Sequence, residues 1–432
     1  MCRLSEKPFS HVVQLAFILF GIKGINKMQL SVRIWMFVSL LAASRALIAF
    51  ELPDWGSLGA TVESDISMEF KQGFTDNLVF QPEGEEVSAI QFFKPKAELA
   101  LLGDVVETSL VLDYERAEFD GSRADAYSDY SANLVVRVSP SLRNRIQLNA
   151  AYLDKHEARG TDFSRGLLAL TLDSPDTYKD QSFGFRYSYG AEGARGRVLF
   201  SVTNWGREYT SRPDVTFVRN RDELQLSSAF VFELAPNIQA VIEARHSGIK
   251  YDGSPGPSLS IRDSEDARYY LGLRWNATGK TEGDIRVGQA YKNFDAPDRE
   301  DFSGFSWEGS ISWLPRTYSN LSLAASRQPR EFLGFGSFII SEKVNLSWSH
   351  AWSERLDSEL FYTALSDDYQ GEALEIDGDL QQHSLGFRVD FDLFRAFTVA
   401  ASVKRSSQSA RIQQFEYDEN QVALHLLLGG YK

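Results

Sequence analysis

Charged side chains alternate with apolar ones along much of this 432-residue chain. Phe387 and Val389 flank Arg388, for example, and Phe391 follows Asp390. Guanidinium and carboxylate groups at such positions can form ion pairs, line a water-filled channel or screen a charged solute. Because successive side chains of a β-strand point to opposite faces, this spacing gathers the charges on one face. The pattern therefore predicts strands with one charged face and one apolar face.

The predicted charged face is mixed in sign. Its candidate members are Arg137, Arg145, Arg186, Arg197, Glu223, Glu243, Arg268, Arg274, Arg286, Glu308, Arg388 and Asp390, together with Glu98, Asp113 and Asp392. Facing lipid at the bilayer midplane would cost about 2–4 kcal/mol for each Arg or Lys. We therefore predict that this face lines an aqueous lumen. Most of its charges are expected to pair across strands, and a ring that screens a charged solute is the alternative.

Turn signals and long polar loops alternate between the candidate strands. Eight short segments carry residues that favour chain reversal, at 101–104, 139–144, 190–196, 234–237, 276–280, 314–320, 352–357 and 393–397. Nine longer polar segments fall between them, near 73–87, 117–127, 155–180, 209–219, 250–266, 294–302, 329–338, 368–380 and 408–417. This alternation predicts an all-β, transmembrane, antiparallel up-and-down β-barrel of the outer-membrane type, with about 18 strands and 16 as the alternative.

The N-terminal residues differ in character from the rest. An apolar stretch, 12–22, precedes Met28, and from Met28 the sequence has a basic residue, an apolar stretch and small residues near Ala49. This order is typical of a signal peptide. We expect residues 1–49 to be a leader with its start at Met28, and residues 50–432 to be a single barrel domain. An anchoring N-terminal helix is the alternative.

Composition narrows the function classes. Residues 51–432 hold 39 Lys and Arg against 58 Asp and Glu, a formal charge of −19, which disfavours nucleic-acid binding. The one cysteine, Cys2, lies in the leader, so the exported part has no thiol for a disulfide, a metal or a nucleophile. We find no G-x-S-x-G motif and no histidine pair with metal-ligand spacing, and we predict neither an enzyme nor a cofactor.

Two loops invite a more specific interpretation. The acidic segments 263–266 and 295–301 could bind Ca²⁺ at the outer surface, although they lack EF-hand spacing and solvated loops are the simpler reading. The segment 155–180, about 26 residues long, could fold inward and narrow the lumen.

Several phrases resemble the Putative beta-barrel porin 2 family. FTDNLVF (74–80) is similar to an opening motif of that family, and FFKPKAEL (92–99) to its following strand. The segments 127–160 and 182–198 resemble its central hairpins. The resemblance covers 57–432 and implies an outer-membrane porin that accompanies exopolysaccharide export, with no catalytic residues to carry over.

The resemblance and the barrel pattern together set the functional expectations. We expect a passive conduit in the outer membrane of a Gram-negative bacterium, with both termini in the periplasm. Expected partners are outer-membrane lipids, the barrel-assembly machinery, periplasmic polysaccharide export or co-polymerase proteins, and the polysaccharide itself. An uptake porin and a non-conducting structural or adhesive barrel are the alternatives.

Overall fold

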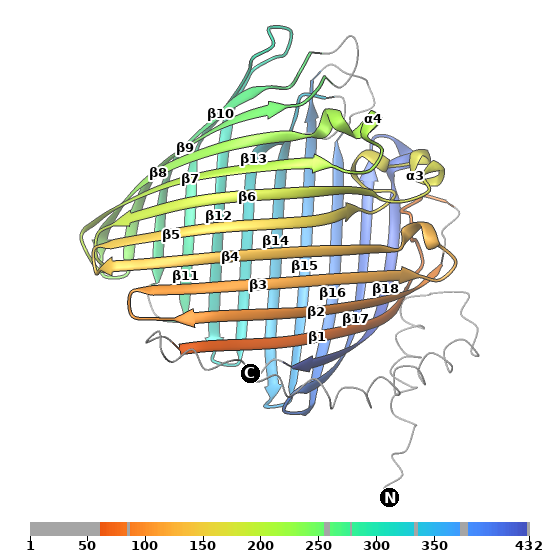
Figure 1. Ribbon diagram of the computed structural model, residues 1–432, viewed down its shortest axis with the longest axis horizontal. Helices are drawn as coiled ribbons and strands as arrows, with labels where there is room; N and C mark the ends of the chain where they lie inside the picture. The colour runs from red at the N-terminus through yellow and green to blue at the C-terminus, as the bar shows by residue number, and fades with distance from the viewer. Residues whose placement is uncertain are drawn as a thin grey trace, which may run out of the picture.

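Eighteen antiparallel strands close into one barrel in the computed structural model, which describes residues 61–83, 87–254, 260–276, 279–331, 336–371 and 379–429. Each strand pairs with the next one in the chain, and β18 closes the ring by pairing with β1 over nine residue pairs. Figure 1 shows β1–β9 in the near wall, crossing the strands of the far wall at a steep angle. Strands that tilt strongly against a barrel axis look this way through the barrel.

The bounds of the elements follow the predicted pattern closely. The strands are β1 (Thr61–Thr75), β2 (Ser88–Leu102), β3 (Val106–Phe119), β4 (Tyr127–Ser141), β5 (Asn144–Glu157), β6 (Asp176–Tyr189), β7 (Gly196–Tyr209), β8 (Arg221–Ala235), β9 (Ile238–Tyr251), β10 (Ser264–Asn276), β11 (Thr281–Phe294), β12 (Phe302–Arg316), β13 (Ser319–Glu331), β14 (Phe338–Ser353), β15 (Leu356–Gln370), β16 (Leu380–Phe394), β17 (Phe397–Ala410) and β18 (Tyr417–Gly429). Short helical turns lie between strands: η3 (Arg123–Asp125), η4 (Asp162–Ser164), α3 (Leu167–Thr171), α4 (Pro213–Thr216), η5 (Phe217–Arg219) and η6 (Gln413–Phe415).

The predicted strand count of 18 is confirmed. All eight predicted turns connect the strand pairs that begin with β2–β3 and end with β16–β17, and the nine predicted loops connect the other pairs. The turn at 393–397, which lacks the usual turn residues, is a two-residue connection between Phe394 and Phe397. The first residue of β1 and the last residue of β18 therefore lie at the same end of the barrel as the short turns.

The two faces of each strand meet different surroundings. Along β16, Leu385, Phe387, Phe391 and Leu393 are exposed on the outside, whereas Arg388 is largely covered. In the ladder, Phe387 lies opposite Leu360 of β15 and Val403 of β17, so an apolar band continues from strand to strand. The strands hold 13–16 residues, more than the 9–11 that cross a hydrocarbon core, so they extend beyond it.

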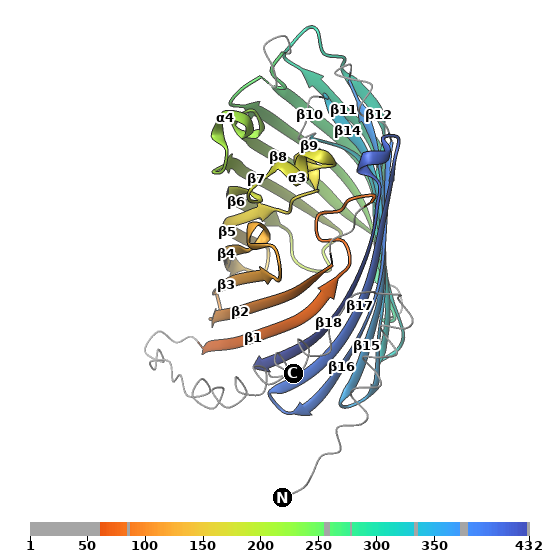
Figure 2. The ribbon, with the colours of Figure 1, turned by 90° about the vertical axis from the view of Figure 1, so that its right-hand side faces the viewer.

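No helix among the described residues is long and apolar enough to span a membrane. The helical turns belong to the loops, and Figure 2 shows α3 between the two walls of the barrel rather than outside it. The predicted leader, residues 1–49, lies outside the described residues, as does Cys2.

Candidate functional site

Contacts between strands that are not neighbours identify the inner face. Arg245 of β9 bonds to Glu308 of β12, with 2.7 Å between Nη2 and Oε1. Arg268 of β10 donates to Gln328 of β13 at 3.0 Å. Side chains from strands this far apart in the ring meet on its concave side, so residues sharing their parity face the lumen.

Six charged residues on β9–β12 form one ion-pair network in the lumen wall. Arg245 also bonds to Glu243, at 2.9 Å, and Arg286 contacts the same two acids. Asp284 accepts from Arg286 at 2.9 Å and from Arg274 at 2.8 Å. The sequence predicts Glu243, Arg274, Arg286 and Glu308 as lumen residues but misses Arg245 and Asp284. Both share the parity of predicted members, so the alternation could have found them.

The other predicted lumen residues lie on the same face but apart from this network. Arg388 bonds to Asp390 through Nε at 2.9 Å and Nη2 at 2.8 Å. Three other arginines have partners close by: Arg197 bonds to Gln239, Arg268 to Gln328 and the Pro329 carbonyl oxygen, and Arg145 to Glu192 and the Gly190 carbonyl oxygen at the β6–β7 turn. Arg137 and Arg186 are exposed, and Glu223 shares the parity of Gln225 and Ser227 on β8.

Glu308 is one of the acids that two arginines share, so its loss should change ion selectivity. Glu308→Gln leaves Arg245 and Arg286 with one less negative charge between them. We expect the ratio of chloride to potassium permeability to rise, by about twofold, as judged from reversal potentials in a KCl gradient. Glu342→Gln is the matched control, because Glu342 pairs with Arg327 on the opposite side of the sheet. An equal shift in both variants would contradict the placement of Glu308 in the lumen.

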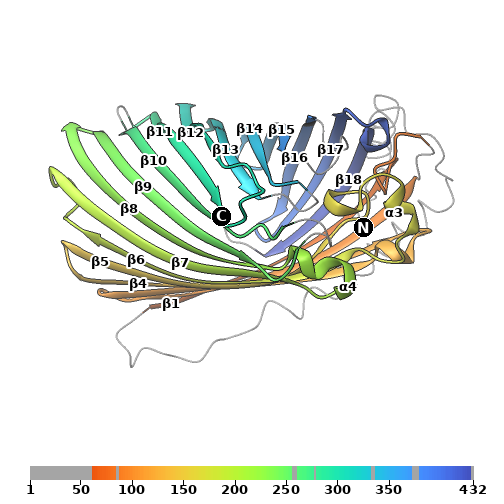
Figure 3. The ribbon, with the colours of Figure 1, turned by 90° about the horizontal axis from the view of Figure 1, so that it is seen from above.

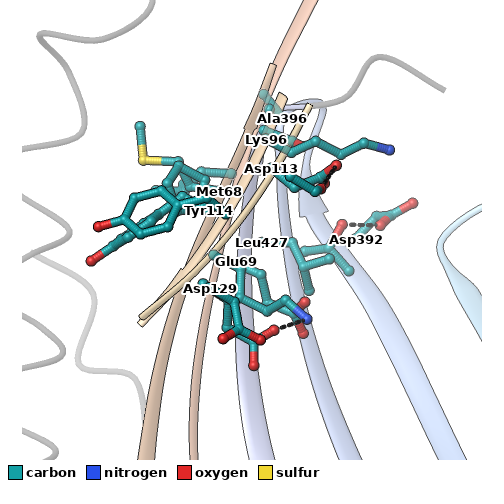
Figure 4. A pocket seen from close by; sticks show the side chains of 18 of the residues that line it. Met68, Glu69, Lys96, Asp113, Tyr114, Asp129, Asp392, Ala396 and Leu427 are labelled. Atoms are coloured by element: carbon teal, nitrogen blue, oxygen red, sulfur yellow. Dashed lines mark hydrogen bonds and ion pairs between the residues drawn. The ribbon is translucent and has the colours of Figure 1, made fainter. Parts of the chain in front are cut away.

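A charged cavity of about 580 Å³ lies on the inner side of the barrel near its closure, between the loop-end halves of β3–β5 and the turn-end residues of β16–β18. Figure 4 shows Glu69, Asp113 and Asp129 on one side of the strands, while Met68 and Tyr114 point to the other. Lys94, Lys96, Glu115 and Lys155 also line it. Positive and negative groups interleave here, so this part of the wall carries no single-sign ring.

A second groove, of about 680 Å³, has a different chemistry. It spans the turn-end halves of β10–β15, where most inner side chains are neutral hydroxyl or amide groups. These are Gln239, Asn276, Ser310, Ser312, Ser322, Asn345, Ser347 and Thr363, beside three charges, Arg274, Glu282 and Asp284. The Asn345 side-chain oxygen accepts from Thr363 at 3.2 Å, which leaves the amide NH₂ of Asn345 to donate.

One aromatic ring lies in this neutral groove. Phe361 of β15 is the ladder partner of Gly386 of β16, and a Cβ added at Gly386 would meet Phe361 Cζ at 2.0 Å. The ring therefore lies over the Gly386 backbone, flat against the wall, and any side chain at 386 would displace it. An aromatic face surrounded by hydroxyl and amide groups can stack on the C–H face of a sugar ring while its hydroxyls are hydrogen-bonded.

The β5–β6 loop crosses the loop end of the barrel. Arg165 in this loop donates to the hydroxyl of Tyr369 on β15 at 2.7 Å. In a ring of 18 strands, β15 lies nine strands from β6 in either direction, which is the opposite wall. Gly166 packs against Phe415 of η6, and α3 lies between the walls in Figures 2 and 3. The predicted inward fold of the β5–β6 loop is therefore confirmed.

The loop is fixed at its base by buried contacts. The Arg159 guanidinium bonds to Asp125 Oδ1 at 2.7 Å and to the carbonyl oxygens of Ala169 and Leu172. Gly160, at φ +85°, packs so closely that a Cβ there would meet the Val79 carbonyl oxygen at 2.1 Å. Leu78, Val79 and Ala169 form a small apolar core with Phe119. These contacts hold the β5–β6 loop in one position, in which it narrows the mouth of the barrel.

Buried cations also tie neighbouring loops to the rim. Arg219, in the β7–β8 loop, is fully buried and bonds to Glu157 and to the Tyr209 hydroxyl. Lys292 is fully buried between Asp266 and Glu331. Removing one partner of a buried pair typically costs 3–5 kcal/mol, so these contacts hold the rim in one arrangement.

The acidic loops are engaged by protein groups. Lys250 lies 3.3 Å from Asp263 and 2.6 Å from Asp295. The Ser260 hydroxyl donates to Asp298 at 2.6 Å and holds the pKa of that carboxyl below its ordinary value. Within the described ranges, no three His, Cys, Asp or Glu side chains gather as a metal site. The Ca²⁺ interpretation gains no support from these contacts.

Comparisons with solved structures return barrels of low sequence identity. OpdO of Pseudomonas aeruginosa has a TM-score of 0.45 at 12% identity, covering 85% of this chain and 98% of its own. The siderophore receptor PirA of Acinetobacter baumannii gives 0.43 at 9%, covering 86% and 81%. The FrpB iron transporter of Neisseria meningitidis (F5-1 variant) gives 0.46 at 10%, covering 82% of this chain and 64% of its own. No curated protein matches the chain.

The family comparison is more decisive. The model described as Putative beta-barrel porin 2 matches residues 67–428, from the middle of β1 to the end of β18. This range holds every lumen residue discussed above. The match and the closed barrel indicate an outer-membrane channel rather than an enzyme family, and the chain belongs to the Putative beta-barrel porin 2 family.

Proposed function

We propose that the barrel is a passive conduit through which an exopolysaccharide chain crosses the outer membrane. The observation that carries this proposal is the neutral groove on β10–β15, where hydroxyl and amide groups surround Phe361. A hydrated neutral polymer can exchange many weak hydrogen bonds along such a wall without being held at one place. The resemblance to a family that accompanies exopolysaccharide export supports the same cargo.

The proposed orientation in the membrane is the one that outer-membrane barrels share. Their short turns and both termini lie in the periplasm, and their long loops lie outside. In that orientation the neutral groove is near the periplasmic entrance, where export or co-polymerase proteins would deliver the chain. The crossing β5–β6 loop is at the outer exit. The driving force comes from synthesis of the polymer or from its concentration gradient.

Uptake of a small solute is the second candidate function. The observation in its favour is the Arg165–Tyr369 contact, because a loop that bridges the mouth suits a small solute better than a polymer. Deleting the gene in its native bacterium separates the two. Export predicts that polymer is still made but accumulates in the periplasm. Normal secretion together with a growth defect on one nutrient would instead establish uptake.

The Phe361 ring gives a prediction at the level of one residue. In planar bilayers, the neutral probe maltohexaose should block the ionic current, and Phe361→Ala should shorten each blockade about three- to tenfold, as expected for loss of one aromatic contact. Leu360→Ala, the neighbouring outward-facing residue, is the matched control. A polyethylene glycol of similar size tests whether the duration of the blockade depends on molecular size alone. Blockades of equal duration in all variants would show that the groove does not recognise sugars.

A further inference from the structure

Three side chains meet in a chain of hydrogen bonds where the barrel closes. Ser402 of β17 lies 2.8 Å from His425, measured from Oγ to Nε2. His425 of β18 lies 2.6 Å from Glu69 of β1, measured from Nδ1 to Oε1. A hydroxyl, an imidazole and a carboxylate are thus joined in order, with Nε2 facing Ser402 and Nδ1 facing Glu69. This is the order of groups in hydrolytic triads of the Ser–His–acid type. Arg388 Nη1 also lies near Nδ1, at the longer distance of 3.5 Å.

The atoms that meet determine what each group can do. The carboxylate of Glu69 can only accept, so it accepts a hydrogen bond from the Nδ1–H of a neutral His425. Nε2 then carries the lone pair and faces the Ser402 hydroxyl, which donates to it. His425 is therefore held in the tautomer that can remove a proton from Ser402. The other tautomer would set the Nδ1 lone pair against the carboxylate.

The ladder explains how distant parts of the chain bring these groups together. His425 is the register partner of Ala400 on one side and Lys71 on the other. Ser402 and Glu69 are each two residues from those partners, so all three side chains lie on one face. Ser402 is also the partner of Arg388, which places this face in the lumen. His425 is 5% exposed, whereas Ser402 is partly open to the lumen.

We propose that Ser402, His425 and Glu69 form a hydrolytic site in the lumen wall for small acyl esters of alcohols or sugar hydroxyls. Ser402 Oγ bonds to the acyl carbon while its proton passes to His425 Nε2. The ester C–O bond then breaks, and the departing alcohol takes that proton. Water attacks the acyl-serine in the same way, with His425 as base, and releases the carboxylic acid. Glu69 acts through His425, as a positioning residue.

Arg388 supplies a positive charge beside Ser402, His425 and Glu69. Its Nη1 lies 3.4 Å from Glu69 Oε1, and its position in the ladder is directly across from Ser402. A guanidinium so placed is the cation on the neighbouring strand that can stabilise the oxyanion of the tetrahedral intermediate. Asp390, which bonds to Arg388, fixes the orientation of that guanidinium.

The experiment uses the full exported chain folded in detergent micelles, with p-nitrophenyl acetate as substrate. We expect Ser402→Ala and His425→Ala to lower kcat/KM about 100-fold or more, as for removal of a triad member. A fluorophosphonate probe should label Ser402, as read by mass spectrometry, and labelling should disappear in His425→Ala. Ser406→Ala is the matched control, since Ser406 lies on the same face of β17 but bonds to Ser384.

Two further readouts separate chemistry from structure. Glu69→Gln should lower kcat more than it raises KM, and Glu69→Asp should restore part of the loss. Ser402→Ala should keep the heat-dependent gel mobility and the conductance of the wild-type barrel, so failure of this proposal and failure of the conduit proposal give different results. Hydrolysis by the wild type no faster than by Ser402→Ala, or labelling at another serine, would overturn the site.

Discussion

Deleting residues 160–173 is expected to raise the single-channel conductance roughly twofold or more, because the β5–β6 loop bridges the barrel from one wall to the other. The deletion joins Arg159 to Ser174 and leaves four residues between the ends of β5 and β6. Since Glu157 and Asp176 are ladder partners, a connection of this length closes the hairpin without strain. The lumen would then open at the loop end over the width that α3 and η4 now occupy.

Two control variants test whether the effect comes from the crossing itself. Arg165→Ala removes only the contact to Tyr369, and we expect a smaller rise in conductance with more frequent current fluctuations. Replacing residues 296–300 by two glycines shortens the β11–β12 loop, in which Arg299 bonds to Ser260, Ile261 and Ser337 of nearby loops and not to the opposite wall. That change should leave conductance unaltered. If the 160–173 deletion folded normally and conducted like the wild type, the loop would not be the constriction.

The same deletion bears on the choice between export and uptake. For a small solute, the loop is the filter, so its removal should broaden the range of solutes that pass. For a polymer, the loop has to move aside during transport, and its removal should leave secretion intact or increase it. Secretion that falls after deletion of the loop, with a folded and conducting barrel, would count against a simple conduit and favour a guiding role for Arg165.

Much of this architecture could be predicted from the sequence because a barrel strand is specified locally. The alternation around Phe387 and Arg388 sets which side chain faces outward, and turn residues set where each strand ends. Even the two-residue connection after Phe394, which lacks Gly and Pro, could be located from the strands on either side. The length of the β5–β6 loop likewise indicated that it could fold inward. The contact between Arg165 of this loop and Tyr369 of β15 could not be predicted.

Contacts between distant strands could not be predicted in the same way. Arg245 and Glu308 meet across β9–β12 only because the sheet curves, and curvature depends on the whole ring. The Ser402–His425–Glu69 chain depends on the register with which β18 closes onto β1, which brings together His425 and Glu69 from positions 356 residues apart. No local pattern carries that register. Alternation in the sequence can assign such groups to one face of a strand, while the closed barrel shows which of them touch.

Phe387→Arg is expected to prevent most of the protein from assembling in a bilayer, whereas Arg388→Ser should leave assembly intact. Phe387 is near the middle of β16 and its side chain is on the outer, exposed face. An Arg at that depth would cost about 2–4 kcal/mol, a large fraction of the stability of a typical domain. The folded fraction in phospholipid vesicles, read from heat-dependent gel mobility and urea unfolding, measures the effect.

The adjacent substitution should act on the lumen instead. Arg388→Ser removes the guanidinium that joins Asp390 to Glu69, and it leaves two carboxylates facing water rather than lipid. We expect a folded barrel with a shift toward cation permeability, and Phe387→Leu as the conservative outer-face control should resemble the wild type. Residues 387 and 388 are adjacent in β16, so they lie at nearly the same depth in the membrane and in the same strand. They differ in the face of the sheet to which their side chains point. Equal tolerance of Phe387→Arg and Arg388→Ser would mean that the outer face of β16 does not contact lipid.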